Sequence, residues 1–227
     1  MADSVLVIAD SGTGKSTSIR TLDPKETFII NIANKPLPFQ GWKSKYTQIS
    51  KENKDGNITS ASSSAGIVKA IQHVDKNMPH IKTLVVDDCQ YMSSFEYFDR
   101  ANEKGYDKFT QIASNLAQVA KMPKDLRDDL YVFFLTHSED STDINGHRKV
   151  KAKTIGKMID NALTLEGLFS IVLFGKVIKQ EDGALEYVFE TKNNGENTCK
   201  SPMGMFDEDK IPNDLHYVKE CIVKFEE

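Results

Sequence analysis

Residues 5–18, VLVIADSGTGKSTS, constrain the fold more than any other part of the chain. The apolar run at 5–8 is typical of a buried strand, the residues after it are small, and Gly14, Lys15 and Ser16 open an expected helix. Small residues at Gly12 and Gly14 let backbone N–H groups curl around a phosphate chain. The start of the helix directs partial positive charge at the same anion. The segment therefore predicts a phosphate-binding loop between a strand and a helix.

Each residue of this loop has an expected role. The expected nucleotide-binding residues are Ala9, Asp10, Ser11, Gly12, Thr13, Gly14, Lys15, Ser16 and Thr17. Lys15 is suited to contact the β- and γ-phosphates and to act in catalysis, and the Ser16 hydroxyl is suited to bind Mg²⁺. Ala9 replaces the first glycine of the usual G-x-x-x-x-G-K-[ST] pattern. Alanine costs little there unless φ is positive, so the loop is expected to keep its function.

Residues 81–88, IKTLVVDD, form a second informative segment, an apolar run that ends in Asp87 and Asp88. This pattern is typical of an inner parallel strand that delivers carboxylates to a site above the sheet. We expect Asp87 to hold Mg²⁺, through water, and Asp88 to orient or deprotonate an attacking water. The alternative is that both aspartates cap a helix that starts near residue 93.

Another strand is predicted at 131–135, and Thr136 and His137 follow it. Polar side chains at a strand tip beside the two aspartates would lie where a γ-phosphate can be sensed. His137 is therefore a candidate catalytic residue that couples the state of the nucleotide to the next loop. Its position is the only signal for this role.

The segment 138–153 is polar and predicts a hairpin that turns at Asn145-Gly146. Its second limb, HRKVKAK at 147–153, is the only dense basic patch in the chain. The candidate nucleic-acid-binding residues are Arg148, Lys149, Lys151 and Lys153. They either grip a phosphodiester backbone or form a solvated hairpin that maintains solubility.

The other segments alternate between strand and helix patterns. Apolar runs predict strands at 27–33, 169–178 and 185–191, and a hairpin turn joins the last two. Helical spacing predicts helices near 67–77 and 109–122, and a short helix or strand closes the chain at 215–225. Residues 35–64 are expected to form a mobile surface loop, in which Trp42 either stacks on a base or anchors the loop to the domain.

Composition limits the class of protein. A chain of 227 residues, 39% hydrophobic and 27% charged, fits one α/β domain over residues 1–227. The net charge of −4 excludes a protein that binds nucleic acid over its whole surface. The 3 cysteines show no C-x-x-C spacing, which argues against disulfides and a zinc site and favours a cytoplasmic location. We expect no signal peptide, membrane-spanning stretch or membrane partner.

The phosphate loop, Asp87-Asp88, Thr136-His137 and the tail KSPMGMF at 200–206, in this order, resemble the phage-encoded RecA-like ATPases. These proteins are often called AAA-domain or nucleotide-binding proteins, and they include the small Sak-type ATPases linked to single-strand annealing and recombination. The resemblance implies an α/β, RecA-like P-loop NTPase fold with a mostly parallel sheet flanked by helices. It also implies another strand between the two that carry the phosphate loop and Asp87. The hairpin predicted at 169–191 would form a C-terminal extension of this sheet.

The resemblance further implies ATP bound at an edge that meets a neighbouring subunit of a homo-oligomeric ring or filament. A cation from one subunit often completes the site of its neighbour in such assemblies, so Lys200 is a candidate catalytic residue in trans, with Lys192 as the alternative. Single-stranded DNA would face the region after His137, and a single-strand-binding protein is a further expected partner. The host cytoplasm is the expected location.

One departure from the family concerns the catalytic base. The strand that ends at residues 32–33 has no glutamate where the bacterial recombinase carries its base, which leaves Asp88 as the substitute. Together these features predict an ATP- and Mg²⁺-binding protein with slow, DNA-stimulated hydrolysis in phage recombination or replication. A small-molecule kinase, such as a nucleotide kinase, and an interaction module that binds ATP without hydrolysing it are the alternatives.

Overall fold

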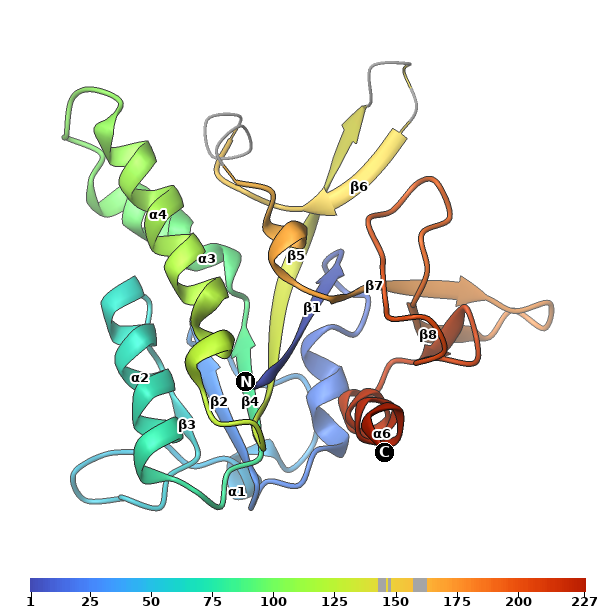
Figure 1. Cartoon of the computed structure of the whole chain (residues 1–227), viewed down its shortest axis with the longest axis horizontal. Helices are drawn as coiled ribbons and strands as arrows, with labels where there is room; N and C mark the ends of the chain where they lie inside the picture. Colours follow the sequence, from blue (N-terminus) through green and yellow to red (C-terminus); the bar gives the residue numbers. More distant parts are fainter. Residues whose placement is uncertain (143–145, 147, 157–162) are drawn as a thin grey trace.

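The computed structural model describes residues 1–142, 146, 148–156 and 163–227. Within this part of the chain a nine-stranded sheet has the order β3-β2-β4-β5-β1-β7-β8-β9, and β6 pairs with β5 (Figure 1). The strands are β1 (Asp3–Ala9), β2 (Thr27–Asn31), β3 (Ile58–Thr59), β4 (Thr83–Asp87), β5 (Tyr131–Thr142), β6 (Arg148–Ala152), β7 (Ile171–Lys179), β8 (Leu185–Glu190) and β9 (Lys210–Pro212). The helices are α1 (Trp42–Lys45), α2 (Ser64–Asn77), α3 (Gln90–Asp99), α4 (Asp107–Lys121) and α6 (Leu215–Glu226), with short 3₁₀ helices η1 (Ser16–Thr21), η2 (Met122–Asp125) and η3 (Leu165–Leu168).

The first six strands of this order, β3-β2-β4-β5-β1-β7, pair in parallel. β8 and β9 add antiparallel pairs at one edge of the sheet. This mostly parallel sheet with helices on its faces is a P-loop NTPase fold, which confirms the predicted fold class. β5 lies between β1 and β4, so another strand separates the phosphate-loop strand from the acidic strand, as predicted. The antiparallel β7–β8 pair is the predicted C-terminal hairpin.

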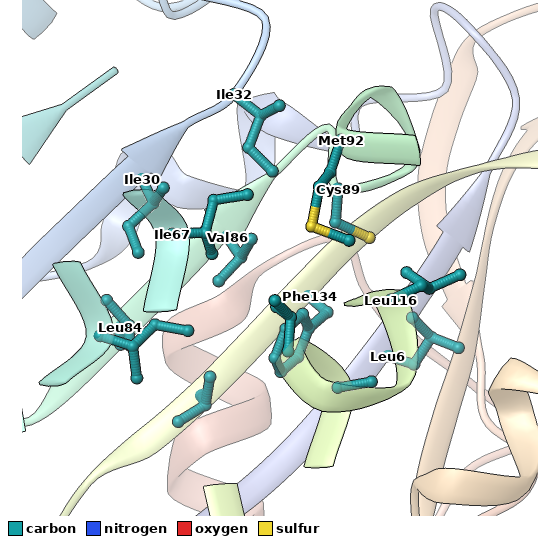
Figure 2. Close-up of a cluster of buried hydrophobic side chains, with 14 of the residues drawn as sticks. Leu6, Ile30, Ile32, Ile67, Leu84, Val86, Cys89, Met92, Leu116 and Phe134 are labelled. Carbon is teal, nitrogen blue, oxygen red and sulfur yellow. The ribbon is translucent and has the colours of Figure 1, made fainter. Parts of the chain in front are cut away.

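Both faces of the sheet are buried, which explains why its inner strands are continuous apolar runs. Figure 2 shows one face, where Leu6 and Phe134 of the sheet pack with Met92 of α3 and Leu116 of α4. Alternate residues such as Val5 lie in the other cluster, which η1, α6 and residues 37–46 cover. β1 is therefore buried on both faces and lies between β5 and β7. No helix in the described ranges is long and apolar enough to cross a membrane.

The predicted strand at 131–135 is longer than expected. β5 continues to Thr142, because residues 138–142 pair antiparallel with β6 from Ser138↔Ala152 to Thr142↔Arg148. Thr136 and His137 therefore lie inside a strand and not at its tip. The two limbs of the hairpin project beyond the sheet edge (Figure 1), while Asn145 and His147 lie outside the described residues.

The segment 35–64 differs from the mobile surface loop expected there. It contains α1 and β3, and the side chains of Leu37, Tyr46 and Ile58 are buried. The Asn57 side chain fixes its path by donating hydrogen bonds to the carbonyls of Pro24 (2.8 Å) and Lys45 (3.0 Å). Trp42 is half-buried against the same core, which fits the anchoring alternative.

Candidate nucleotide-binding site

The phosphate loop connects β1 to η1 at the carboxyl edge of the parallel strands. Gly12 and Gly14 have φ values of +82° and +86°, a left-handed conformation that favours glycine. Thr13 closes the turn by donating its hydroxyl to the Asp10 carbonyl at 2.8 Å. The helix that follows is a six-residue 3₁₀ helix, so its dipole contributes less than that of a longer α-helix.

Ala9 is accommodated because its position needs no positive φ. Among the described residues other than glycine, only Asn34 and Asp88 have one. Ala9 pairs with His137 on one side and Gly175 of β7 on the other. A Cβ atom at Gly175 would lie 2.8 Å from the Ala9 Cβ. Gly175, which has no side chain, thus leaves the space that the methyl group of Ala9 occupies.

Asp88 is the centre of a cluster of charges. Its carboxylate is fully buried, with Lys15 Nζ 2.6 Å and His137 Nε2 3.4 Å from Oδ1 and Lys35 Nζ 2.5 Å from Oδ2. Burial raises the pKa of Asp88, but the hydrogen bond from His137 and the two ammonium groups outweigh it and hold the pKa well below its usual range. Asp88 is therefore ionised at neutral pH, and its basicity is low.

Asp87 faces the start of η1. Its buried Oδ1 accepts a hydrogen bond of 2.9 Å from the Ser16 hydroxyl. Burial raises the pKa of Asp87, against the opposing effect of the Lys15 charge. A serine hydroxyl and a carboxylate are the partial oxygen ligand set that fits Mg²⁺, which normally keeps waters and nucleotide phosphates as its other ligands. Ser16 and Asp87 are thus the residues that could hold this ion.

The alternative in which the two aspartates cap the next helix does not hold. α3 begins at Gln90 after Cys89, and no side chain caps its first turn. The side chains of Asp87 and Asp88 accept hydrogen bonds from Ser16 and Lys15. The acidic pair therefore belongs to the phosphate loop.

A cavity of about 570 Å³ opens over the loop, within the range of small-molecule sites. Its lining residues are Asp10, Ser11, Gly12, Gly14, Lys15, Ser16, Thr17, Arg20, Lys35, Pro38, His137, Tyr187 and Asn213. Lys35 and His137 line the part next to Asp88. Tyr187 and Asn213 line the part next to Gly14, where a Cβ would lie 3.1 Å from each side chain.

Sequence reasoning missed these two ends of the cavity. Lys35 follows the carboxyl end of β2, the strand beside β4, so the rule that pointed to Asp87 could have found it. Tyr187 and Asn213 come from β8 and the residue after β9, far from the loop in the chain. Only the order of the strands brings them to the loop, and no local pattern signals that.

Lys200, the predicted catalytic residue in trans, does not line the cavity of its own chain. The backbone of Lys200 pairs with Val172 of β7, which in turn lies opposite Leu6, in the middle of β1 and away from its loop end. The alternative lysine, Lys192, forms an ion pair of 2.6 Å with Asp209.

The basic hairpin carries its own counter-charges. Arg148 pairs with Asp140 at 2.8 Å, and Lys151 pairs with Glu139 at 3.1 Å, both from the β5 limb. Lys149 and Lys153 are exposed. At the foot of the hairpin, Ser138 donates a hydrogen bond to the Asp10 side chain of the phosphate loop. The hairpin therefore joins the nucleotide cavity directly.

The strand order, the loop with its two left-handed glycines and the acidic pair beneath it define the class of protein, a P-loop NTPase. A family model described as "AAA domain" matches residues 1–203, and the chain belongs to that family. Both the geometry of the site and the family match identify the chain as a nucleotide-binding protein.

Among solved structures, the chain is similar to the genome packaging NTPase B204 from Sulfolobus turreted icosahedral virus 2 in complex with ATP-gammaS. The two share 12% sequence identity over 80% of this chain and 78% of that chain, with a TM-score of 0.38. No protein with a curated description matches the chain.

Proposed function

We propose that this protein binds ATP with Mg²⁺ at the phosphate loop and hydrolyses it. The observation that carries the proposal is that Lys15 and Ser16 line the 570 Å³ cavity and are bonded to the buried carboxylates of Asp88 and Asp87. Lys15 supplies positive charge for the β- and γ-phosphates, and Ser16 with Asp87 holds the metal ion. Asp88 orients or deprotonates the attacking water, with His137 beside it.

Hydrolysis is slow in this proposal because the base is weak. The efficiency of a general base follows its pKa, and the charges around Asp88 lower that pKa. Residues 32–33 after β2 supply no glutamate base, and Lys35 after them contacts Asp88 instead. Movement of a cation away from Asp88 would therefore be needed for full activity.

We further propose that the protein is RecA-like in its action, forms a homo-oligomeric ring or filament and acts on single-stranded DNA in phage recombination or replication. The exposed Lys149 and Lys153 support DNA binding by the hairpin. The contact between Ser138 and Asp10 supports a link from bound DNA to the nucleotide. Lys200 or Lys192 would act on a neighbouring subunit, and a single-strand-binding protein is a proposed partner.

The test is phosphate release from ATP with and without single-stranded DNA. Arg148, Lys149 and Lys151 changed together to Ala should remove stimulation by DNA and leave the basal rate unchanged. A matched variant, with the exposed Lys43, Lys45 and Lys51 of the segment 35–64 changed to Ala, should keep the stimulation. Unchanged stimulation in the hairpin variant would refute the DNA-binding role.

A second candidate function is a nucleotide-gated interaction module. It is favoured by the complete burial of Asp88 and its contacts with Lys15, Lys35 and His137, which leave little basicity for catalysis. For this candidate, Asp88→Asn should keep full biological activity, because only binding matters. For an ATPase, the same change should remove that activity.

A further inference from the structure

Lys35 is a cation that the phosphate-loop pattern does not account for. Its Nζ lies 2.5 Å from Oδ2 of Asp88, and its side chain is 56% exposed along the wall of the cavity. The same Nζ lies 5.6 Å from the centre of the Tyr91 ring, a cation–π distance. The ammonium group therefore sits where a buried carboxylate meets the open part of the cavity.

The backbone around Lys35 is fixed by two asparagines. The buried Asn31 side chain donates to the Lys35 carbonyl at 2.6 Å and accepts from the Lys35 N–H at 3.3 Å. Asn34 has a φ of +51°, a conformation that few residues other than glycine adopt, and the Ser60 hydroxyl donates to its side chain at 2.7 Å. The turn thus has a defined shape that directs Lys35 to Asp88.

Two ammonium groups share one carboxylate at this end of the cavity. Lys15 and Lys35 both contact Asp88, and Asp87 is already engaged by Ser16. Burial lowers the pKa of Lys35, but Asp88 raises it more, so Lys35 stays charged at neutral pH. Lys35 is the more exposed of the two cations that contact Asp88, and its side chain lines the cavity beside the phosphate loop.

We propose that Lys35 is a second phosphate-binding cation, which exchanges Asp88 for the terminal phosphate of a nucleoside triphosphate. This inference rests on the proposed nucleotide-binding function. Lys15 serves the β- and γ-phosphates from the loop, and the long, flexible stem of Lys35 lets its ammonium group turn from Asp88 into the cavity and add a second cation at the γ-phosphate. A diphosphate lacks the terminal phosphate that Lys35 would bind, so the proposed contact distinguishes triphosphate from diphosphate. The exchange also frees Oδ2 of Asp88, which links triphosphate binding to release of the base.

The competing explanation is that Lys35 only neutralises the buried Asp88. The two explanations differ when Asp88 carries no charge. A neutralising lysine has no role beside Asp88→Asn, whereas a phosphate-binding lysine keeps its role there. The double variant Asp88→Asn with Lys35→Ala therefore separates them.

The experiment is equilibrium titration with a non-hydrolysable ATP analogue and with ADP. Lys35→Ala should weaken the ATP analogue about 10-fold, the loss of one charged contact, and change ADP binding less than about 2-fold. Lys35→Arg, which keeps the charge, and Lys51→Ala, an exposed lysine of the same segment, should retain the wild-type preference. Lys35→Met, which keeps the length of the stem without the charge, decides the same question if Lys35→Ala unfolds.

In the Asp88→Asn background, Lys35→Ala should still weaken the triphosphate analogue selectively. Equal weakening of both nucleotides, no weakening, or an effect that disappears in that background would overturn the role of Lys35. Wild-type protein that binds neither nucleotide, or Lys15→Ala that binds both normally, would instead overturn the proposed function. The two failures are therefore distinguishable.

Discussion

Gly175→Ala is a direct test of the packing behind the phosphate loop. The new Cβ would lie 2.8 Å from the Ala9 Cβ, about 1 Å closer than carbon atoms at their preferred separation. Neither strand can move apart freely, because β1 is held between β5 and β7 with buried layers on both faces. Overpacking of this kind costs about 1–3 kcal/mol, so unfolding in urea should show a loss of about 2 kcal/mol. For a chain of this size, that loss corresponds to about 4–8 °C in Tm.

Ala9→Gly is the matched partner for this experiment. It removes the methyl group that Gly175→Ala would strike and restores glycine at the first position of the loop pattern. Alone it should cost about 0.5–1 kcal/mol, as glycine does in a strand. Combined with Gly175→Ala, it should recover at least about 1 kcal/mol relative to the sum of the single changes. A neutral Gly175→Ala, or strictly additive single changes, would refute the reasoning that the two positions share one space.

Three other outcomes follow from the site. Gly14→Ala should weaken nucleotide binding at least about 10-fold in a titration, because the position has a φ of +86° and its Cβ would press on Asn213 and Tyr187. Asp88→Asn should lower phosphate release about 100-fold or more while nucleotide binding persists, and an unchanged rate would exclude Asp88 as the base. The pKa of Asp88 is lowered in the folded chain, so its contribution to stability is present above about pH 4 and is lost as the pH falls further. Denaturation titrations below pH 4 should therefore show a steeper loss of stability in the wild type than in Asp88→Asn.

The parts of the fold that local patterns could predict are those whose signals lie close together in the chain. The apolar run of β1, the small loop residues and Lys15 are consecutive, and they form the predicted strand, loop and helix start. The run ending in Asp87 likewise forms the predicted inner strand. The position of β5 between β1 and β4 came from family resemblance, since no local pattern specifies strand order.

Other features depend on contacts that no local pattern carries. The outer half of β5, SEDST, is polar because it leaves the core, and only pairing with β6 makes it a strand. The segment 35–64 is polar on average, yet single residues such as Leu37 and Tyr46 anchor it to the core. The ion pair between Lys35 and Asp88 depends on the left-handed turn at Asn34, which the sequence does not reveal.

Phosphate release from ATP by the wild type and by Lys15→Ala, each with and without single-stranded DNA, tests the proposed function most directly. We predict slow release by the wild type, faster release with DNA, and none above background for Lys15→Ala under either condition. Release that is equal in the two proteins would contradict catalysis at this loop. Release that depends on Lys15 but not on DNA would keep the nucleotide site and reject its control by DNA.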